Sequence, residues 1–460
     1  MAYDDGVDTI ITCDNGISAI DQIQYAKDLG LTVIVTDHHD VPFIEEDGVR
    51  TFLSSQADAI INPKQIECEY KFKSICGAGV AFKLMEALYE EIGMDKEECY
   101  KLIEFVAIAT VCDVVDLIDE NRIFVKNGLE MLNNSKNIGI NALKKACGLE
   151  DKEITAYHLG FVIGPCLNAS GRLDSAKKGL ELLLMEDDEE AEKLAQEIVD
   201  LNDARKNMTK EGVDRAINII DSTDINNDKI LVVYIPDIHE SLAGIVAGRV
   251  KEKYNKPTII LTKSEEGVKG SARSIEEYNM FEGLLACKEL LDKFGGHPMA
   301  VGLSLQEDKV DELRKALNNK CELTDEDLTR KIMIDSSLPL EYLNLHLIEE
   351  LNVLEPFGKG NSKPVFGVRD AKITKAMLLG KDKNVLKLKL LTNNNITIDA
   401  MIFNDLENFE SKIIEKYGNE ELDNLYNKSN NNISMDFTFY PSINEWNGNK
   451  SIQIVVNGIR

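Results

Sequence analysis

The stretch TIITCDNGISAIDQIQYAKDLGLTVIVTDHHD at residues 9–40 decides the fold class. A short β-branched run at 9–13 and a longer one at 31–36 predict strands, and residues 19–29 between them have the spacing of a helix. Gly30 ends that helix, as a glycine commonly does. A strand, a helix and a second strand in this order predict a βαβ unit with a right-handed crossover. The fold class is therefore α/β with a parallel sheet.

The first 65 residues are predicted to form a strand, a helix, a strand, a loop and a strand in this order. A third strand is expected at 57–61, where Asn62-Pro63 stops it, and the segment between residues 37 and 56 is expected to be a loop. Helices are expected next, at 78–91, 98–109 and 122–134.

A long helix and a second α/β unit follow. Residues 187–220 carry apolar side chains at steps of three and four, and Asp187 is a suitable N-cap, so one connecting helix is expected. Beyond it we expect strands at 229–235 and 258–262 and helices at 241–254 and 280–293.

The character of the sequence changes at about residue 330. Short strand-like runs are separated by turns rich in Asn, Gly and Lys, with one helical stretch at 405–417, and this pattern predicts a small β-barrel. The runs lie at 331–335, 365–369, 385–391, 396–402, 434–440 and 451–456.

The composition is that of a soluble globular protein. Hydrophobic residues make up 43% of the chain and charged residues 29%, which excludes disorder as the main state. No apolar run approaches the roughly 18 residues of a membrane helix, and the acidic N-terminus has no apolar core of a secretory signal. The cytoplasm is therefore the expected compartment, without a membrane partner.

The nine cysteines include no CxxC pair and are expected to be thiols rather than disulfides.

Charge is distributed unevenly along the chain. The net charge of −28 argues by itself against nucleic-acid binding, because phosphate contacts need Lys and Arg. Residues 361–400, however, carry eight basic and three acidic side chains, a net charge of +5, within the predicted barrel. The basic side chains are Lys363, Arg369, Lys372, Lys375, Lys381, Lys383, Lys387 and Lys389.

Carboxylate and imidazole side chains directly follow two strands. Asp14 follows the strand at 9–13, and Asp37-His38-His39-Asp40 follows the strand at 31–36. Because parallel strands end at one edge of a sheet, we expect these groups to converge. Carboxylate with imidazole is a ligand set for Mn²⁺, Mg²⁺, Fe²⁺ or Zn²⁺. Adjacent histidines point in different directions in an extended segment, so one can bind a metal while the other faces a substrate.

Asp113 is a third acidic candidate. It lies in the apolar stretch AIATVCDVVDL at 107–117, where an unpaired carboxylate would be costly to bury. We expect it to meet a cation, a helix end or a metal, with Asp116 as a rival for that role or as a cap.

Three later motifs combine small residues with potential anion donors. In GPCLNASGR at 164–172, Gly and Pro predict a fixed loop, and Asn168, Ser170 and Arg172 suit a phosphate. The segment at 270–274 repeats the pattern of small residues with an arginine. Gly295-Gly296-His297 is expected in a tight loop after a helix, where paired glycines let backbone N–H groups approach a phosphate.

Together these motifs resemble those of a known family. TCDNGISA at 12–19 and VTDHHD at 35–40 resemble motifs of the DHH phosphoesterase superfamily, and six further segments resemble its RecJ family of single-stranded-DNA-specific exonucleases. The resemblance runs nearly end to end, with the motifs in the family's order. The six segments are TVCDVVDL at 110–117, GPCLNASGRL at 164–173, IHESLAGIVAGRV at 238–250, GSARS at 270–274, FGGHPMAVGL at 294–303 and LEPFGKGN at 354–361.

The resemblance implies a metal-dependent exonuclease that acts in DNA repair and recombination. It implies removal of nucleotides from single-stranded DNA, 5′ to 3′, at a two-metal site for Mn²⁺ or Mg²⁺. A monomer is expected, with a single-strand-binding protein or a helicase as candidate protein partners. The implied parts are an N-terminally incomplete DHH catalytic domain at 1–178, a connecting helix at 179–222, a DHH-associated substrate-binding domain at 223–325 and a nucleic-acid-binding OB-fold at 326–460.

The resemblance also assigns roles to residues. Asp14, His38 and Asp113 match metal ligands, and His39 with Asp37 matches the catalytic part of the motif. The implied substrate contacts are Asn168, Arg172, Ser271, Arg273, Ser274, Gly295, Gly296 and His297. The side chains expected to hold the strand on the OB-fold are Lys372, Lys375, Lys387 and Lys389.

One departure from the family pattern concerns its first motif. That motif is a DxDxDG-like strand, well upstream of the second motif, and supplies two further carboxylates; here the second motif begins at residue 12. Tyr3-Asp4-Asp5-Gly6 stands too close to Asp14 for a crossover helix, and the end of a helix and a turn are expected there. We therefore expect a chain without the family's N-terminal portion, with an incomplete two-metal site and poor nuclease activity.

Two other functions stay open. One is a DHH phosphodiesterase acting on short or cyclic oligonucleotides, against which the barrel and its basic segment argue. The other is a catalytically impaired nucleic-acid-binding fragment. The absent first motif favours the fragment, and the retained DHH and GGH motifs oppose it.

Overall fold

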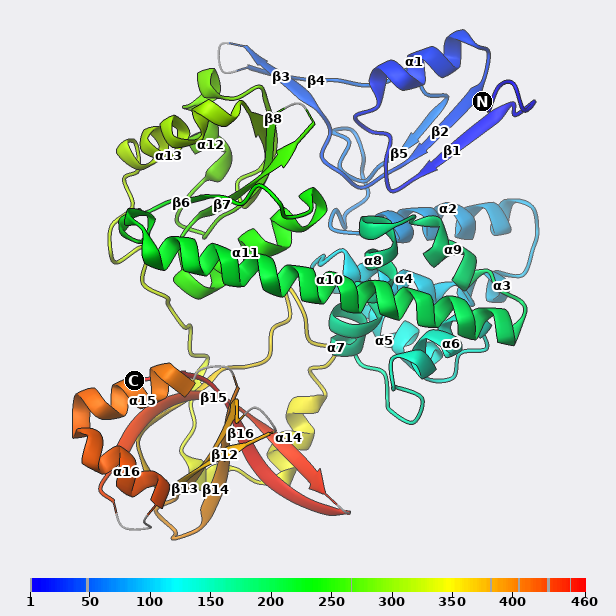
Figure 1. Ribbon diagram of the computed structural model, residues 1–460. Helices are drawn as coiled ribbons and strands as arrows, with labels where there is room; N and C mark the ends of the chain where they lie inside the picture. The colour runs from blue at the N-terminus through cyan, green and yellow to red at the C-terminus, as the bar shows by residue number, and fades with distance from the viewer. Residues whose placement is uncertain are drawn as a thin grey trace. The chain divides into compact units, whose positions relative to one another are not determined.

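The computed structural model describes residues 2–46, 49–265, 267–380, 383–403, 406–427, 431–446 and 448–460 (Figure 1). Lys381 and position 405 of the predicted helix lie outside these ranges. The chain divides into two compact units, residues 1–131 with 332–460, and residues 132–331. Within the described ranges, the helices are too short or too polar to cross a membrane.

The predicted βαβ unit is confirmed. Strands β1 (Thr9–Cys13), β2 (Thr32–Thr36) and β5 (Ala59–Ile61) form a parallel sheet in the order β1-β2-β5, with α1 (Ile20–Asp28) between the first two strands (Figure 1). Val33 and Val35 of the central strand are buried against Ile23 of α1. Residues before the sheet form a turn, in which the Gly6 backbone N–H donates to the Tyr3 carbonyl at 3.1 Å.

The expected loop between residues 37 and 56 is instead partly a hairpin. Strands β3 (Phe43–Glu46) and β4 (Val49–Phe52) pair antiparallel. The rings of Phe43 and Phe52 lie 5.7 Å apart and Arg50 lies 4.6 Å from the centre of the Phe43 ring. These cross-strand contacts stabilise two strands of only four residues each.

Helices complete the N-terminal part of the first unit. They are α2 (Gly77–Glu91), α3 (Lys96–Tyr100), α4 (Ile103–Cys112) and α5 (Asp119–Asn133). The single helix predicted at 98–109 is therefore two, because Lys101 and Leu102 separate α3 from α4. Asp113 is the C-cap residue of α4, an end whose backbone carbonyls do not stabilise a carboxylate.

The C-terminal part is a closed β-barrel, as predicted. The sheet order is β11-β12-β13-β14-β16-β15, and an additional pairing of β12 with β15 closes it. The strand predicted at 331–335 is absent from the described residues, where β11 comprises only Ser336–Ser337. The other strands are β12 (Phe366–Leu379), β13 (Val385–Leu391), β14 (Thr397–Phe403), β15 (Ser434–Trp446) and β16 (Asn449–Ile459), with helices α14 (Leu345–Asn352), α15 (Leu406–Tyr417) and α16 (Asn419–Asn427).

The second unit joins a helical layer to an α/β layer. Helix α10 (Asp188–Ser222) is the predicted long helix, with the Asp187 carboxylate accepting from the Glu190 N–H, and it packs on both layers (Figure 1). It begins later than residue 179, since residues 177–183 form a separate helix, α9. The other helices are α6 (Ile138–Ala146), α7 (Ala156–His158), α8 (Gly164–Leu173), α11 (Ala243–Tyr254), α12 (Met280–Leu285) and α13 (Val310–Asn319).

Two segments predicted as loops in this unit, and a third that resembles them in composition, are regular structure. The segment at 164–172 belongs to α8, because Pro165 is tolerated in a first helical turn. The segment at 270–273 belongs to β8 (Gly267–Arg273), and Gly295-Gly296-His297 belongs to β9 (Lys293–His297), so the helix predicted at 280–293 is also too long. The strand order is β6-β7-β8-β10-β9, with β6 (Leu231–Tyr234), β7 (Thr258–Ser264) and β10 (Ala300–Leu305).

Candidate functional site

Asp14 and His38 lie at the carboxyl ends of neighbouring parallel strands. The Asp14 N–H donates to the Thr36 carbonyl at 3.0 Å, so the chain leaves β1 beside the end of β2. Asp14 has a left-handed backbone, with φ of 62°, which a short polar side chain tolerates better than most. This turn directs its carboxylate toward His38.

The imidazole of His38 lies near the carboxylates of two other predicted metal ligands, Asp14 and Asp113. Asp113 is outside the group Asp14, His38 and His39, whose potential ligand atoms all lie within 4.8 Å of one another. The Nε2 atom of His38 lies 3.0 Å from Oδ1 of Asp14 and 3.5 Å from Oδ2 of Asp113. The His38 side chain is only 11% exposed, and its Nε2 atom is buried without a hydrogen bond of acceptable geometry. The buried nitrogen of His38 lies close to two carboxylates but makes no hydrogen bond with them. A divalent cation bound to all three groups would give this nitrogen a partner, so the donor set fits Mn²⁺ or Mg²⁺.

His39 reaches the same place but is held differently. Potential ligand atoms of Asp14, His38 and His39 all lie within 4.8 Å of one another. The Nδ1 atom of His39 lies 2.7 Å from Oδ1 of Asp37, and its side chain is 56% exposed. The two histidines therefore differ in exposure, and the prediction that one binds a metal while the other faces a substrate stays a prediction.

Asp37 is a buried carboxylate that orients this motif. It accepts hydrogen bonds from the backbone N–H groups of Ile17 at 2.9 Å, His38 at 2.7 Å and His39 at 3.2 Å. Burial alone would raise the pKa of Asp37, but these hydrogen bonds and the one with the His39 ring lower it below its usual value. Asp37 thus stays ionised and fixes the His39 ring, which keeps Nε2 of His39 available to a ligand.

The pKa of Asp113 is affected by burial and by its charged neighbours. Burial raises its pKa above the ordinary value; the His38 ring opposes this and the Asp14 carboxylate adds to it. A cation bound between these groups would relieve the repulsion between the two carboxylates. Asp116, the rival candidate, instead pairs with Lys359, whose Nζ lies 3.5 Å from its Oδ1.

Three residues that support the site escape sequence reasoning. Gly77 opens α2 beside Asp14; the buried Asn62 side chain donates to the His39 carbonyl at 2.9 Å; and Lys64 pairs with Asp40 at 2.8 Å. In the sequence, Asn62-Pro63 indicates only the end of a strand. Its polar side chain after an apolar strand, by analogy with Asp14 and Asp37, is the signal that could have identified it.

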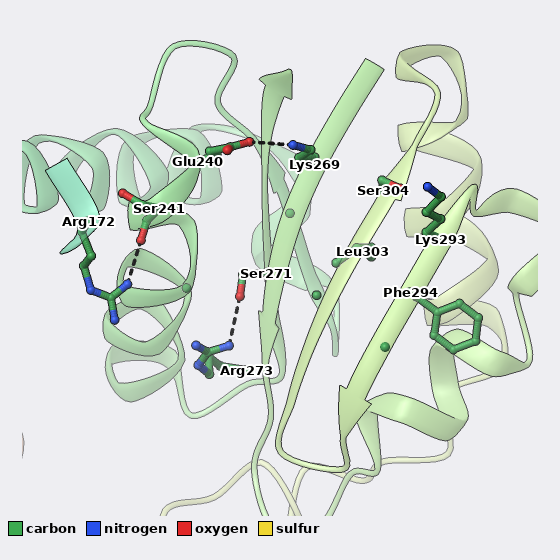
Figure 2. Close-up of a pocket in the computed structure, with 14 residues that line it drawn as sticks. Arg172, Glu240, Ser241, Lys269, Ser271, Arg273, Lys293, Phe294, Leu303 and Ser304 are labelled. Carbon is green, nitrogen blue, oxygen red and sulfur yellow. Dashed lines mark hydrogen bonds and ion pairs between the residues drawn. The ribbon is translucent and has the colours of Figure 1, made fainter. Parts of the chain in front are cut away.

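A second candidate site is a pocket of about 560 Å³ within the second unit (Figure 2). It brings together Arg172 of α8, Ser271 and Arg273 of β8, and Gly295 of β9. Figure 2 shows the Arg172 guanidinium donating to the Ser241 carbonyl, at 3.1 Å, and that of Arg273 donating to the Ser271 hydroxyl, at 3.0 Å. The remaining lining residues are Glu240, Ser241, Gly244, Lys269, Gly270, Lys293, Phe294, Gly302, Leu303 and Ser304.

The pocket concentrates positive charge without a matching set of carboxylates. Burial, and then the charge of Arg172, lower the pKa of Arg273 below its ordinary value. Lys269 pairs with Glu240 at 3.1 Å. A bound anion would relieve the unfavourable proximity of the two arginines, and the start of α11 near Gly244 adds favourable backbone dipoles.

Glycines keep this pocket open. A β-carbon on Gly244 would lie 2.7 Å from an Nη atom of Arg273 and 3.0 Å from the Ser271 hydroxyl. Gly295 and Gly302 face each other across β9 and β10 and leave backbone exposed. The sequence singled out Gly295 but gave no reason to select Gly244 or Gly302, because strand pairing places them.

The other predicted substrate contacts lie outside this lining. Asn168 is exposed on α8, and His297 is exposed at the end of β9. Ser274 is buried, and its hydroxyl donates to the Tyr278 carbonyl at 2.6 Å. Gly296 has φ of 145°, and a β-carbon there would lie 2.3 Å from the Ala300 carbonyl, so its glycine is required by the backbone.

The lysines predicted on the barrel fall into two pairs. Lys372 and Lys375 are exposed on β12. Lys387 and Lys389 of β13 both contact Asp399 of β14, at 2.6 and 2.9 Å. Burial raises the pKa of Asp399, but the hydrogen bonds from these lysines prevail and lower it, so Asp399 offsets part of the local positive charge.

Family comparisons divide the chain into three segments. Residues 3–110 match the DHH family N-terminal domain, residues 227–323 the DHHA1 domain, and residues 334–458 the RecJ OB domain. The chain is 33% identical to the single-stranded-DNA-specific exonuclease RecJ of Haemophilus influenzae, covering all of this chain and 78% of that protein.

Two other comparisons concern length and fold. The RecJ exonuclease of Bacillus subtilis is 36% identical over 98% of this chain, which spans only 54% of that relative. The crystal structure of Thermus thermophilus RecJ in complex with Mn²⁺ superimposes with a TM-score of 0.78 at 26% identity, covering 98% of this chain and 62% of that one.

Proposed function

The chain belongs to the RecJ family, and from this premise we propose that it is a metal-dependent exonuclease that removes nucleotides from the 5′ end of single-stranded DNA. The observation that carries the proposal is the unsatisfied Nε2 atom of His38, buried between the carboxylates of Asp14 and Asp113. A divalent cation is the ligand that these three groups share. The Mn²⁺ and Mg²⁺ complexes of the Thermus thermophilus relative support this choice of ions.

Asp14, His38 and Asp113 would hold the metal in this proposal. When bound, the metal supplies Lewis acidity toward a phosphodiester and lowers the pKa of a bound water. The chain's own contribution is to fix the three ligands from two strand ends and a helix end, so that little reorganisation is needed.

His39 is proposed to act on the substrate rather than to serve only as a ligand. Its Nδ1 atom is engaged by the ionised Asp37, so its Nε2 atom is free to contact a phosphate oxygen or to hold a proton near the leaving oxygen. Asp37 is a positioning residue in this scheme. It acts through His39 and through the backbone that carries both histidines.

The arginines of the pocket are proposed to bind a phosphate of the DNA strand. Arg172 and Arg273 offer planar donors, and Ser271 and the Gly295 backbone can add neutral contacts. The barrel is proposed to hold the strand through exposed lysines such as Lys372 and Lys375, with little sequence preference.

A comparison of substrates tests the proposal. The protein is incubated with Mn²⁺ and either a long 5′-phosphorylated single strand, the matching duplex, or a dinucleotide, and Mn²⁺ binding is measured in parallel. We expect weak Mn²⁺ binding and slow release of nucleotides from the single strand, in line with the poor activity predicted from the sequence, and we expect both to be lost in His38→Ala. Faster hydrolysis of the dinucleotide than of the long strand would favour a phosphodiesterase of short oligonucleotides instead. Mn²⁺ binding unaffected by His38→Ala would remove the proposed metal centre.

A further inference from the structure

A loop that leads into the barrel binds the helix that follows Asp113. We call residues 353–361 the clamp loop. The guanidinium of Arg122, in the first turns of α5, donates to the carbonyls of Leu354 and Glu355 at 2.7 Å each, and to those of Val353 at 3.3 Å and Pro356 at 3.4 Å. One arginine thus engages four consecutive backbone carbonyls of a segment more than 230 residues away.

The clamp loop also contacts the turn between α4 and α5. The Leu117 backbone N–H donates to the Lys359 carbonyl at 2.7 Å, and the Lys359 ammonium pairs with Asp116. Gly360 packs so closely that a β-carbon on it would lie 2.9 Å from the Asp116 β-carbon, and Gly358 faces Leu117 at similar range. Leu117 is 2% exposed, so this contact is part of the core rather than a surface touch.

The turn between α4 and α5 has a strained backbone immediately after Asp113, the proposed metal ligand. Val114, next to Asp113, has φ of 56°, a conformation that is a true outlier for a β-branched residue. Asp119, at the start of α5, also has positive φ, at 42°. Such a backbone persists only where its surroundings over-determine it. The contacts that hold the far end of this turn are those of Arg122 and the clamp loop, together with Asn121, whose side chain donates to the Asp116 carbonyl at 2.9 Å.

We propose that Arg122 and the clamp loop position Asp113 for metal binding, so that a segment entering the C-terminal barrel is a working part of the metal centre. This inference rests on the proposed function of Asp113 as a ligand. Arg122 is a positioning residue: it touches neither the metal nor the substrate in this scheme, and it acts by holding the turn that carries Asp113.

The chemistry of the contact favours an arginine specifically. A planar guanidinium can donate along several directions at once, whereas an ammonium is a compact point charge on a flexible stem. The acceptors are themselves fixed, because the Asn361 side chain donates to the carbonyls of Leu354 and Pro356 at 2.8 and 2.9 Å. Arg122→Lys keeps the charge and loses this geometry, so it separates positioning from simple electrostatic attraction.

The test measures Mn²⁺ affinity and thermal unfolding on the same samples of the full chain. Mn²⁺ alone is the probe, followed by its electron paramagnetic resonance signal. We expect Arg122→Ala to weaken Mn²⁺ binding by about tenfold or more, the usual effect of losing a residue that orients a ligand, and Arg122→Lys to fall between it and the parent. Gly360→Ala places a methyl group against Asp116 and strains a backbone with φ of 73°, so it should shift the clamp loop and weaken binding without removing any donor.

Arg314→Ala is the matched control. Arg314 is a well-paired arginine of the second unit, bound to Asp224 and Asp228, and its loss should lower the unfolding temperature without changing Mn²⁺ affinity. If Arg122→Ala does not fold, Arg122→Lys and Gly360→Ala carry the test.

The outcomes separate the two proposals. Mn²⁺ binding that depends on His38 but is equal in the parent, Arg122→Ala and Gly360→Ala overturns the clamp and leaves the metal centre standing. Loss of Mn²⁺ affinity that follows the unfolding temperature equally in Arg122→Ala and Arg314→Ala also overturns the clamp. Absence of any His38-dependent binding in the parent overturns the proposed metal centre, and the clamp with it.

Discussion

The carboxylate of Asp14 packs against Gly77 so closely that a β-carbon on Gly77 would lie 2.2 Å from Oδ1 of Asp14. Gly77 is the first residue of α2, so the carboxylate that we propose as a metal ligand packs directly against the start of a helix. The absence of a side chain at this position is therefore a requirement of the site and not a local preference of the helix.

We expect Gly77→Ala to displace Asp14 and to weaken Mn²⁺ binding by about tenfold, as loss of a ligand's support commonly does. The helix itself should tolerate alanine. The matched control is Gly248→Ala in α11, where no other atom lies within 4 Å of a new β-carbon. That variant should bind Mn²⁺ as the parent does and be about 0.5–1 kcal/mol more stable, since alanine is the better helix former. Equal Mn²⁺ affinity in Gly77→Ala would show that Asp14 does not need its present position.

Asp37→Asn should make the protein less stable in a way that depends on pH. The asparagine loses a buried charge that accepts three backbone N–H groups, at an expected cost of about 1–3 kcal/mol at pH 7. Because the folded-state pKa of Asp37 is lowered, the parent gains this stability above the unfolded pKa of about 3.9 and loses it as the pH falls through the lower folded value. The unfolding temperatures of the parent and Asp37→Asn are measured from neutral pH to below pH 4. The difference between these two temperatures should become smaller only at the acidic end. A constant difference would assign the loss to packing.

Arg172→Gln should weaken binding of a 5′-phosphorylated oligonucleotide while leaving the fold as stable as before or slightly more stable. The reason is that burial, and after it the charge of Arg172, lower the pKa of Arg273, so Arg172 disfavours the neighbouring cation until an anion binds. Oligonucleotide affinity and unfolding temperature are measured together. Loss of both stability and affinity would mean that Arg172 serves mainly to hold α8 through its bond to the Ser241 carbonyl.

Asp399→Asn should strengthen single-stranded DNA binding by the full chain. It releases Lys387 and Lys389 from a shared carboxylate, and each further phosphate that a lysine neutralises releases counterions from the DNA. We expect severalfold tighter binding at low salt and a steeper decline with added salt. Asp423→Asn, an exposed change of the same charge on α16, is the control. If both variants bind alike, the tighter binding reflects net charge, and the strand does not use Lys387 and Lys389.

The sequence by itself determined the βαβ unit, the barrel and the residues that we propose as metal ligands. Alternation and helical spacing are local properties, and Asp14 and the Asp37–His39 group follow their strands directly, so sheet topology alone brings them to one edge. For Asp113 the sequence left a cation, a helix end and a metal open, and only the folded chain places it at the C-cap of α4, close to His38.

Tertiary structure decided what supports those residues. Glycine-rich segments that resemble loops become strands β8 and β9 because they pair with distant partners, Gly270 with Leu303 and Gly295 with Gly302. Arg122 and the clamp loop stand 231 to 234 positions apart, and a backbone carbonyl that accepts a hydrogen bond leaves no trace in the residue types of its own segment. Local patterns encode elements and their chemistry; contacts between remote backbones exist only once the chain has folded.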